Sequence, residues 1–190
     1  MPKSLAQPKA STRRTSGRGS TVQAEIRQGK PFRSLAQEAT IALLRTASVV
    51  GRAVGRAVES SGLSLAQYNA LRIVRGAGAG GIPTLAIRER MIEEGTTITR
   101  LLDKLEEGGL IRRERSVPDR RQVICYATDA GKRLLDQLDP RVDESDELAM
   151  GGLDDEQLAQ LVATLDAIRA ANAERGAARS APAHRPAAYR

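Results

Sequence analysis

The sequence predicts a mainly α-helical fold with one small β-hairpin in its second half. Apolar residues recur three and four positions apart through most of the chain, which is the spacing of helices that bury one face. Two short runs, 110–115 and 122–127, are strand-like instead, and a polar turn that contains proline separates them. The expected order is four helices, the hairpin and two more helices.

A long helix is expected to begin the folded region. Its apolar positions run from Phe32 to Val58, and Gly62 can adopt the left-handed conformation that ends a helix. Ser64 then offers a capping oxygen for a second helix. The glycine-rich run 76–81 is expected to be a flexible connector. A phosphate-binding loop is disfavoured, because the run is too short and no Lys-Ser/Thr pair follows it.

Two short helices come next. Thr84 is expected to cap the first, which ends at about Met91. The second ends at Gly108 and Gly109 and carries apolar residues at positions i, i+3, i+4 and i+7. These residues are Ile98, Leu101, Leu102 and Leu105.

After the hairpin, Thr128 and Asp129 give a capping oxygen and an acidic side chain at a helix start. A helix is expected from there despite Pro140. Together these elements predict a winged helix-turn-helix over about residues 63–131. The flanking helices are expected at about 32–61, 129–146 and 154–173.

The net charge of +7 is concentrated in the ends of the chain. Residues 1–30 carry seven basic residues and one acidic residue, and residues 175–190 carry four arginines and no acid. The body, residues 31–174, has more acidic than basic residues. We therefore expect two disordered basic tails around a folded body. The tails either add phosphate contacts or serve solubility alone.

Several classes of protein are excluded by composition. The long apolar segment is interrupted by Arg45, Arg52 and Arg56, so it does not suit a membrane span. Cys125 is the single cysteine, which fits a reducing cytoplasm. His184 is the single histidine, so neither a histidine-based metal cluster nor a catalytic triad is available. We expect no enzyme, no metal and no cofactor.

The hairpin and the helix before it suit DNA. The major groove accepts a helix with an apolar back and a polar front, and here Asp103 and Lys104 lie on the polar front. Arg100 can bond a guanine or a phosphate, and arginines at the hairpin tip can reach the minor groove. The candidate DNA contacts are Thr96, Thr97, Thr99, Arg100, Lys104, Arg120 and Arg121.

Four segments carry a resemblance to a known family. They are 97–106 (TITRLLDKLE), 109–113 (GLIRR), 118–121 (PDRR) and 126–131 (YATDAG). In this order they resemble the recognition helix, the wing and the following helix start of the MarR family of bacterial regulators. The resemblance extends over about residues 63–135 and implies that the candidate contacts above face DNA.

The resemblance also implies roles for residues outside the DNA-facing set. Asp119 would support the wing by holding an arginine through a charged hydrogen bond, or else it is a simple turn-former. Phe32, Tyr68 and Arg72 would line a cleft for a small-molecule effector, or else they are core and surface residues. For Cys125, burial is favoured over a thiol switch.

The resemblance implies a homodimer formed by the terminal helices and bound to a pseudopalindromic promoter site in double-stranded DNA. The expected protein is a bacterial, cytoplasmic, nucleoid-associated transcriptional repressor that responds to a ligand. The sequence departs from the family pattern at Ile92 and Glu93, where a glycine and an apolar residue are usual. Two alternatives stay open: a nucleoid-type protein that binds DNA through its basic arms, and a winged helix that binds another protein.

Overall fold

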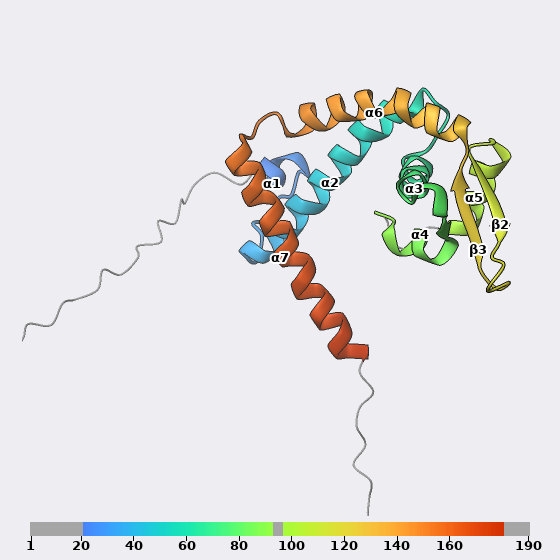
Figure 1. Ribbon diagram of the computed structural model, residues 1–190. Coiled ribbons are helices and arrows are strands. Elements are labelled where there is room, and N and C mark those ends of the chain that lie inside the picture. The colour runs from blue at the N-terminus through green and yellow to red at the C-terminus, as the bar shows by residue number, and fades with distance from the viewer. Residues whose placement is uncertain (1–20, 93–96, 181–190) are drawn as a thin grey trace, which may run out of the picture. The chain divides into compact units, whose positions relative to one another are not determined.

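The computed structural model describes residues 21–92 and 97–180 (Figure 1). The chain divides into two compact units, residues 1–49 and residues 50–190. Helix α2 (Leu35–Glu59) contributes its first part to one unit and its last part to the other. Within the described ranges, no helix has both the length and the apolar character that a membrane crossing needs.

The first unit contains α1 (Thr21–Glu25) and the first part of α2. The chain between them is held by the Gln23 side chain, which donates to the carbonyl oxygen of Gln28 at 3.2 Å. Arg45 of α2 pairs with Glu25 at 3.3 Å. The expected disordered arm 1–30 is therefore wrong for residues 21–30, because local hydrogen bonds order them. Residues 1–20 lie outside the described residues.

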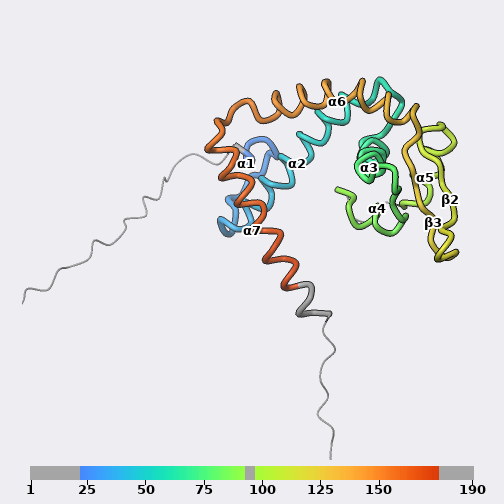
Figure 2. The backbone as a smooth tube through the Cα atoms, in the orientation of Figure 1, coloured from blue at the N-terminus to red at the C-terminus, as the bar shows by residue number. Residues whose placement is uncertain are grey.

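The second unit is the winged helix with its flanking helices, and the predicted fold class is confirmed. Figure 2 shows α4, α5 and the hairpin gathered around α3. The elements after α2 are α3 (Leu65–Gly76), the 3-10 helix η1 (Gly78–Gly80), β1 (Ile82–Pro83), α4 (Thr84–Arg90), α5 (Ile98–Glu107), β2 (Ile111–Arg115), β3 (Val123–Ala127), α6 (Asp129–Met150) and α7 (Asp155–Ser180).

One apolar core joins these elements. Leu71 of α3 and Leu102 of α5 are fully buried, as are Leu135 of α6 and Ile111 of β2. Val58, near the end of α2, belongs to the same core. Full burial of a side chain of this size contributes about 1.5–3 kcal/mol. The burial of these periodic apolar residues is therefore the main source of stability.

The sheet has three strands, in the order β1-β3-β2, all antiparallel. The sequence predicts only β2 and β3. Strand β1 pairs Ile82 with Cys125 and Pro83 with Ile124, and at two residues it is too short to show a period. Before it, Gly81 has φ 66°, and a Cβ there would lie 2.5 Å from the ring of Tyr126. The run 76–81, expected to be a flexible connector, therefore contains a 3-10 turn and is closely packed at Gly81.

The predicted helix starts are confirmed at two of three places. Ser64 and Gln67 form a capping box, in which the Gln67 amide donates to Ser64 Oγ at 3.2 Å. Thr128 Oγ1 accepts from the Gly131 amide at 3.1 Å. Thr84 does not cap α4, because Pro83 occupies the capping position. The Thr84 hydroxyl instead donates to the carbonyl oxygen of Val123, 3.3 Å away, and so joins α4 to the sheet.

Helix α6 continues through Pro140 as far as Met150, beyond the predicted end at 146. Around the proline it is held by α3: Arg75 pairs with Asp136 at 3.3 Å and with Asp139 at 2.7 Å. The Tyr68 hydroxyl donates to Asp139 as well, at 3.4 Å. These bonds fix α6 where its backbone loses one hydrogen-bond donor.

Helix α7 begins at Asp155, close to the predicted start at 154, and runs to Ser180. It therefore includes residues 175–180, which were expected to belong to a disordered tail. Four of the six residues of this stretch are alanines or arginines, which favour the helix, whereas Gly176 disfavours it. Residues 181–190 lie outside the described residues.

Gly131 in the first turn of α6 permits a close contact with the residue that precedes β2. A Cβ at this position would lie 2.2 Å from the carbonyl oxygen of Leu110. We expect Gly131→Ala to lower the free energy of unfolding by about 1–3 kcal/mol, because the clash outweighs the better helix propensity of alanine. Urea unfolding followed by circular dichroism measures this change.

Gly76 provides the matched control. It is the last residue of α3, and nothing lies within 4 Å of a Cβ built there. Gly76→Ala should leave the urea midpoint unchanged or slightly higher. Equal stability of the two variants would contradict the proposed contact.

Candidate nucleic-acid interface

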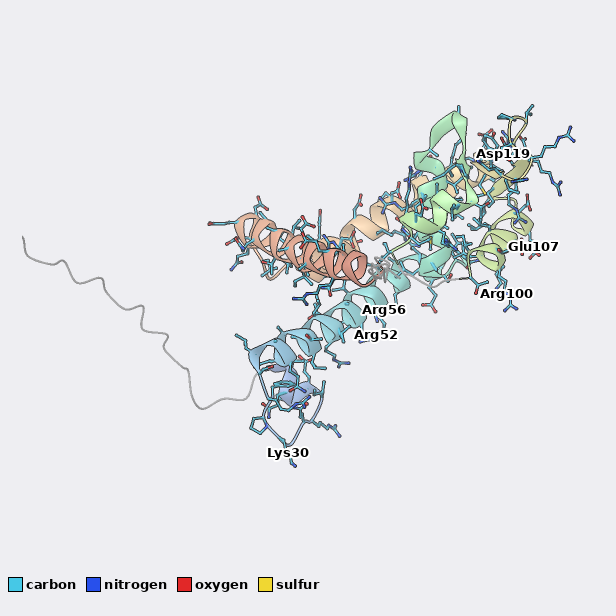
Figure 3. All side chains as sticks on the ribbon, turned by 90° about the horizontal axis from the view of Figure 1, so that it is seen from below. Lys30, Arg52, Arg56, Arg100, Glu107 and Asp119 are labelled. Carbon is cyan, nitrogen blue, oxygen red and sulfur yellow. The ribbon has the colours of Figure 1, made fainter. Side chains whose placement is uncertain are left out.

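Helix α5 has the buried back and exposed front that the sequence predicts. Leu101, Leu102 and Leu105 are buried against the core. The described candidate contacts of this helix and its start, which are Thr97, Thr99, Arg100 and Lys104, are all exposed. Figure 3 shows Arg100 projecting away from α5. Thr96 lies outside the described residues.

The tip of the β2–β3 hairpin is a well-bonded turn. The Ser116 amide donates to the carbonyl oxygen of Gln122 at 3.0 Å, and the Gln122 amide donates to the carbonyl oxygen of Asp119 at 2.9 Å. Arg120 and Arg121 are exposed beyond this closure. The tip therefore presents two guanidinium groups on a short, defined loop. Figure 3 labels Asp119 of this loop.

Asp119 organises this loop through the backbone. Its Oδ1 accepts from the backbone amide of Arg121 at 3.0 Å, and its Oδ2 accepts from the side chain of Gln122 at 3.1 Å. The resemblance implied a charged bond to an arginine side chain, but the bond observed goes to the peptide of that arginine. Asp119 thus supports the wing as a turn-former, which places the Arg121 side chain indirectly.

Arg113 of β2 joins the hairpin to α5. Its guanidinium contacts Glu106 at 2.6 Å and Asp103 at 2.7 Å, and its backbone amide donates to Glu106 at 3.0 Å. The side-chain hydrogen bond from Arg113 lowers the pKa of Glu106, and the same bond raises the pKa of Arg113. The sequence placed Asp103 on the DNA-facing front, and its partner Arg113 was missed because the two residues meet only through the fold.

A groove of about 670 Å³ lies between α4, the start of α5 and the wing. Arg88 of α4 lines it together with Thr99 and Arg121, so three elements contribute polar groups to one surface. Arg88 was not among the residues expected to touch DNA. The sequence carried no specific signal for it, because its position beside the wing follows from how α4 packs in the fold.

The proposed effector residues are placed in different surroundings. Phe32 is half-buried in the first unit. Tyr68 is 3% exposed, and burial raises the pKa of its hydroxyl. Arg72 is exposed, with its guanidinium carbon 5.7 Å from the centre of the Tyr68 ring. Tyr68 and Arg72 therefore lie together on α3, with Tyr68 forming part of the core.

Cys125 is fully buried in β3, and this burial raises the pKa of its thiol. Its sulfur lies 3.8 Å from the hydroxyl of Thr84. A buried thiol that is kept protonated is a poor nucleophile, so the packing interpretation agrees with the structure. Among the described residues, no three His, Cys, Asp or Glu side chains are grouped closely enough to hold a metal ion.

The helical core, the exposed front of α5 and the arginine-tipped hairpin define a winged helix-turn-helix protein of the DNA-binding type. The model of the MarR family matches residues 63–123. The chain is 36% identical to a MarR transcription factor from Planctomyces limnophilus of known structure, with a TM-score of 0.56 over 71% of this chain and 98% of that one. The chain belongs to the MarR family, a family of transcriptional regulators, and the predicted resemblance is confirmed.

Two further relatives are informative. The transcriptional regulator TtmR from Methylorubrum extorquens is 32% identical over 106 residues, which cover 56% of this chain and 53% of TtmR. The chain therefore spans about half the length of that relative. The structure of CouR from Rhodococcus jostii RHA1, bound to p-coumaroyl-CoA, is 30% identical with a TM-score of 0.62, over 72% of this chain and 95% of CouR.

The pKa shift of Glu106 gives a testable pH dependence. A carboxyl group whose pKa is lowered in the folded state stabilises the fold above its unfolded pKa, near 4.5, and this stabilisation is lost as the pH falls through the folded pKa. We expect Glu106→Gln to be less stable than the wild type at neutral pH. The difference should shrink as the pH falls below about 4.5, because the wild-type carboxyl then becomes protonated.

Thermal unfolding of both proteins across this pH range tests the expectation. Glu107→Gln, an exposed neighbour on the same helix, is the matched control and should follow the wild type throughout. A wild-type advantage over Glu106→Gln that stayed constant down to strongly acidic pH would contradict it.

Proposed function

We propose that this protein is a homodimeric repressor that binds a pseudopalindromic promoter site in double-stranded DNA. The observation that supports this most directly is the pairing of α5 with the arginine-tipped hairpin through Arg113. A helix and a wing held together in this way can enter adjacent grooves of one duplex as a unit.

In this proposal α5 lies in the major groove. Thr96, Thr97 and Thr99 bond phosphates or contact thymine methyl groups, and Arg100 reads a guanine edge. Lys104 contacts a phosphate. Arg120 and Arg121 enter the neighbouring minor groove, where the negative potential favours guanidinium groups. These roles agree with the exposure of the described members of the set.

The exposed apolar side chains of the terminal helices support a dimer. Large apolar side chains exposed in this number on single helices usually mark an interface. Those of α2, α6 and α7 are Leu35, Leu43, Leu44, Val49, Leu148, Val162 and Ile168. Two copies related by a two-fold axis would place two α5 helices on half-sites about 34–36 Å apart.

The proposed dimer would also carry the response to a small-molecule effector. CouR, solved with p-coumaroyl-CoA, is the relative that supports this step. An effector that binds better to one spacing of the two α5 helices would change DNA affinity by that difference in binding free energy. The exposed Arg72, beside the buried Tyr68, is the group that we propose to meet an acidic effector.

The DNA proposal is tested by genomic footprinting of the wild-type protein, followed by binding to one recovered site. We expect Arg100→Ala and Arg121→Ala each to weaken binding to that site by about 1–3 kcal/mol. Arg133→Ala, an exposed arginine of α6, removes the same charge and should bind as the wild type does. Binding is measured at several salt concentrations because phosphate contacts depend on salt.

Two results would overturn this proposal. Equal wild-type affinity for random DNA, abolished by deletion of residues 1–30, would favour a nucleoid-type protein. A protein that binds no DNA at all would favour the other alternative, a winged helix that binds another protein.

The dimer is tested by a charge placed on its proposed surface. Val162 of α7 is 57% exposed and lies in the row formed with Leu158 and Leu165. We expect Val162→Asp to shift the protein toward monomer in sedimentation equilibrium, because a buried carboxylate without a partner is costly. Ala163→Asp, on the opposite face of α7, should remain a dimer. The same molecular mass for both variants in sedimentation equilibrium would contradict the proposed dimer surface on α7.

A further inference from the structure

Val117 is a large apolar side chain presented to solvent at the tip of the wing. It is 92% exposed, more than any other large apolar side chain in the described residues. It lies two residues after the end of β2 and directly before Pro118, within a loop that carries arginines. Packing in the core does not explain an apolar residue at this position, because the Val117 side chain is almost fully exposed.

The loop holds Val117 in a defined position. The Ser116 amide is bonded to the carbonyl oxygen of Gln122 at 3.0 Å, which closes the loop immediately before Val117. On the other side, Pro118 has a fixed φ angle, and the Asp119 amide donates to Ser116 Oγ at 3.4 Å. An apolar side chain on a rigid loop loses little conformational entropy when it meets a partner.

We propose that Val117 is a specificity-determining residue that packs into the DNA minor groove and disfavours guanine there. The proposal rests on the proposed function, since it requires that the hairpin tip enters that groove. Arg120 and Arg121 supply the attraction to phosphates and to the negative groove, and Val117 supplies the apolar contact.

The chemistry of the groove gives this contact its selectivity. A·T pairs present only acceptor atoms in the minor groove, whereas a G·C pair adds the 2-amino group of guanine at the groove floor. An apolar side chain cannot bond that amino group and would remove it from water. Proteins that enter the minor groove commonly place apolar side chains against base steps in this manner.

The test uses three versions of one binding site recovered by footprinting. Hydroxyl-radical protection that is lost in Arg121→Ala locates the pairs under the wing. These pairs are then made all A·T, all I·C or all G·C. Inosine lacks the 2-amino group, so I·C resembles A·T in the minor groove and G·C in the major groove.

We expect the wild type to bind the A·T and I·C sites at least about five-fold more tightly than the G·C site, which is the low end of the effect of one changed base pair. Val117→Ser should reduce this preference to less than about two-fold, and Val117→Ile should retain it. Neither change alters the slope of affinity against salt, because neither alters a charge. Both variants should unfold at the wild-type urea concentration, since Val117 is exposed.

A Val117→Ser protein with the full wild-type preference for I·C over G·C would overturn the assignment, even if its total affinity fell. A wild-type protein that binds the A·T, I·C and G·C versions of the site with equal affinity would overturn it as well. Failure of the wild type to bind any site would instead refute the proposed function, so the two failures are distinguishable.

Discussion

The ion pairs of Arg113 with Asp103 and Glu106 are the constraint on which the candidate interface depends. Taken alone, a hairpin of two five-residue strands is marginally stable, and its direction relative to a neighbouring helix is poorly defined. Here Arg113 fixes that direction, because its Nε and Nη2 both donate to Oε2 of Glu106, at 2.8 and 2.6 Å. Arg113 pairs with both Asp103 and Glu106 of α5, so one of the two negative charges near the exposed Arg100 is balanced within the protein.

The same constraint divides the charged residues of the centre by role. Arg113 is turned toward α5, and Arg112 on the adjacent position of β2 stacks 4.0 Å above the ring of Tyr126. Arg120 and Arg121 remain exposed. The net basic charge of the hairpin therefore overstates the positive charge that it presents to a partner, because Arg113 is paired with the acidic residues of α5.

Much of the fold follows from local patterns and was predictable. The caps at Ser64 and Thr128 act within four residues, and the apolar period of α5 places its leucines in the core without knowledge of other elements. Strand β1 was not predictable, because two residues have no period and its pairing partner lies about forty positions away. Of the candidate site, the exposed front of α5 was predictable, whereas the pairing of Asp103 with Arg113 required the packed structure.

The proline in α6 has a mechanical consequence for the molecule. Pro140 has no amide hydrogen to donate to the carbonyl oxygen of Asp136, so the helix resists bending least at that turn. Arg75 forms ion pairs with both Asp136 and Asp139, and thereby ties this turn of α6 to α3. The part of α6 that follows Pro140 lies beyond these ion pairs, so a change in its direction at Pro140 would leave the groove between α4, α5 and the wing in place.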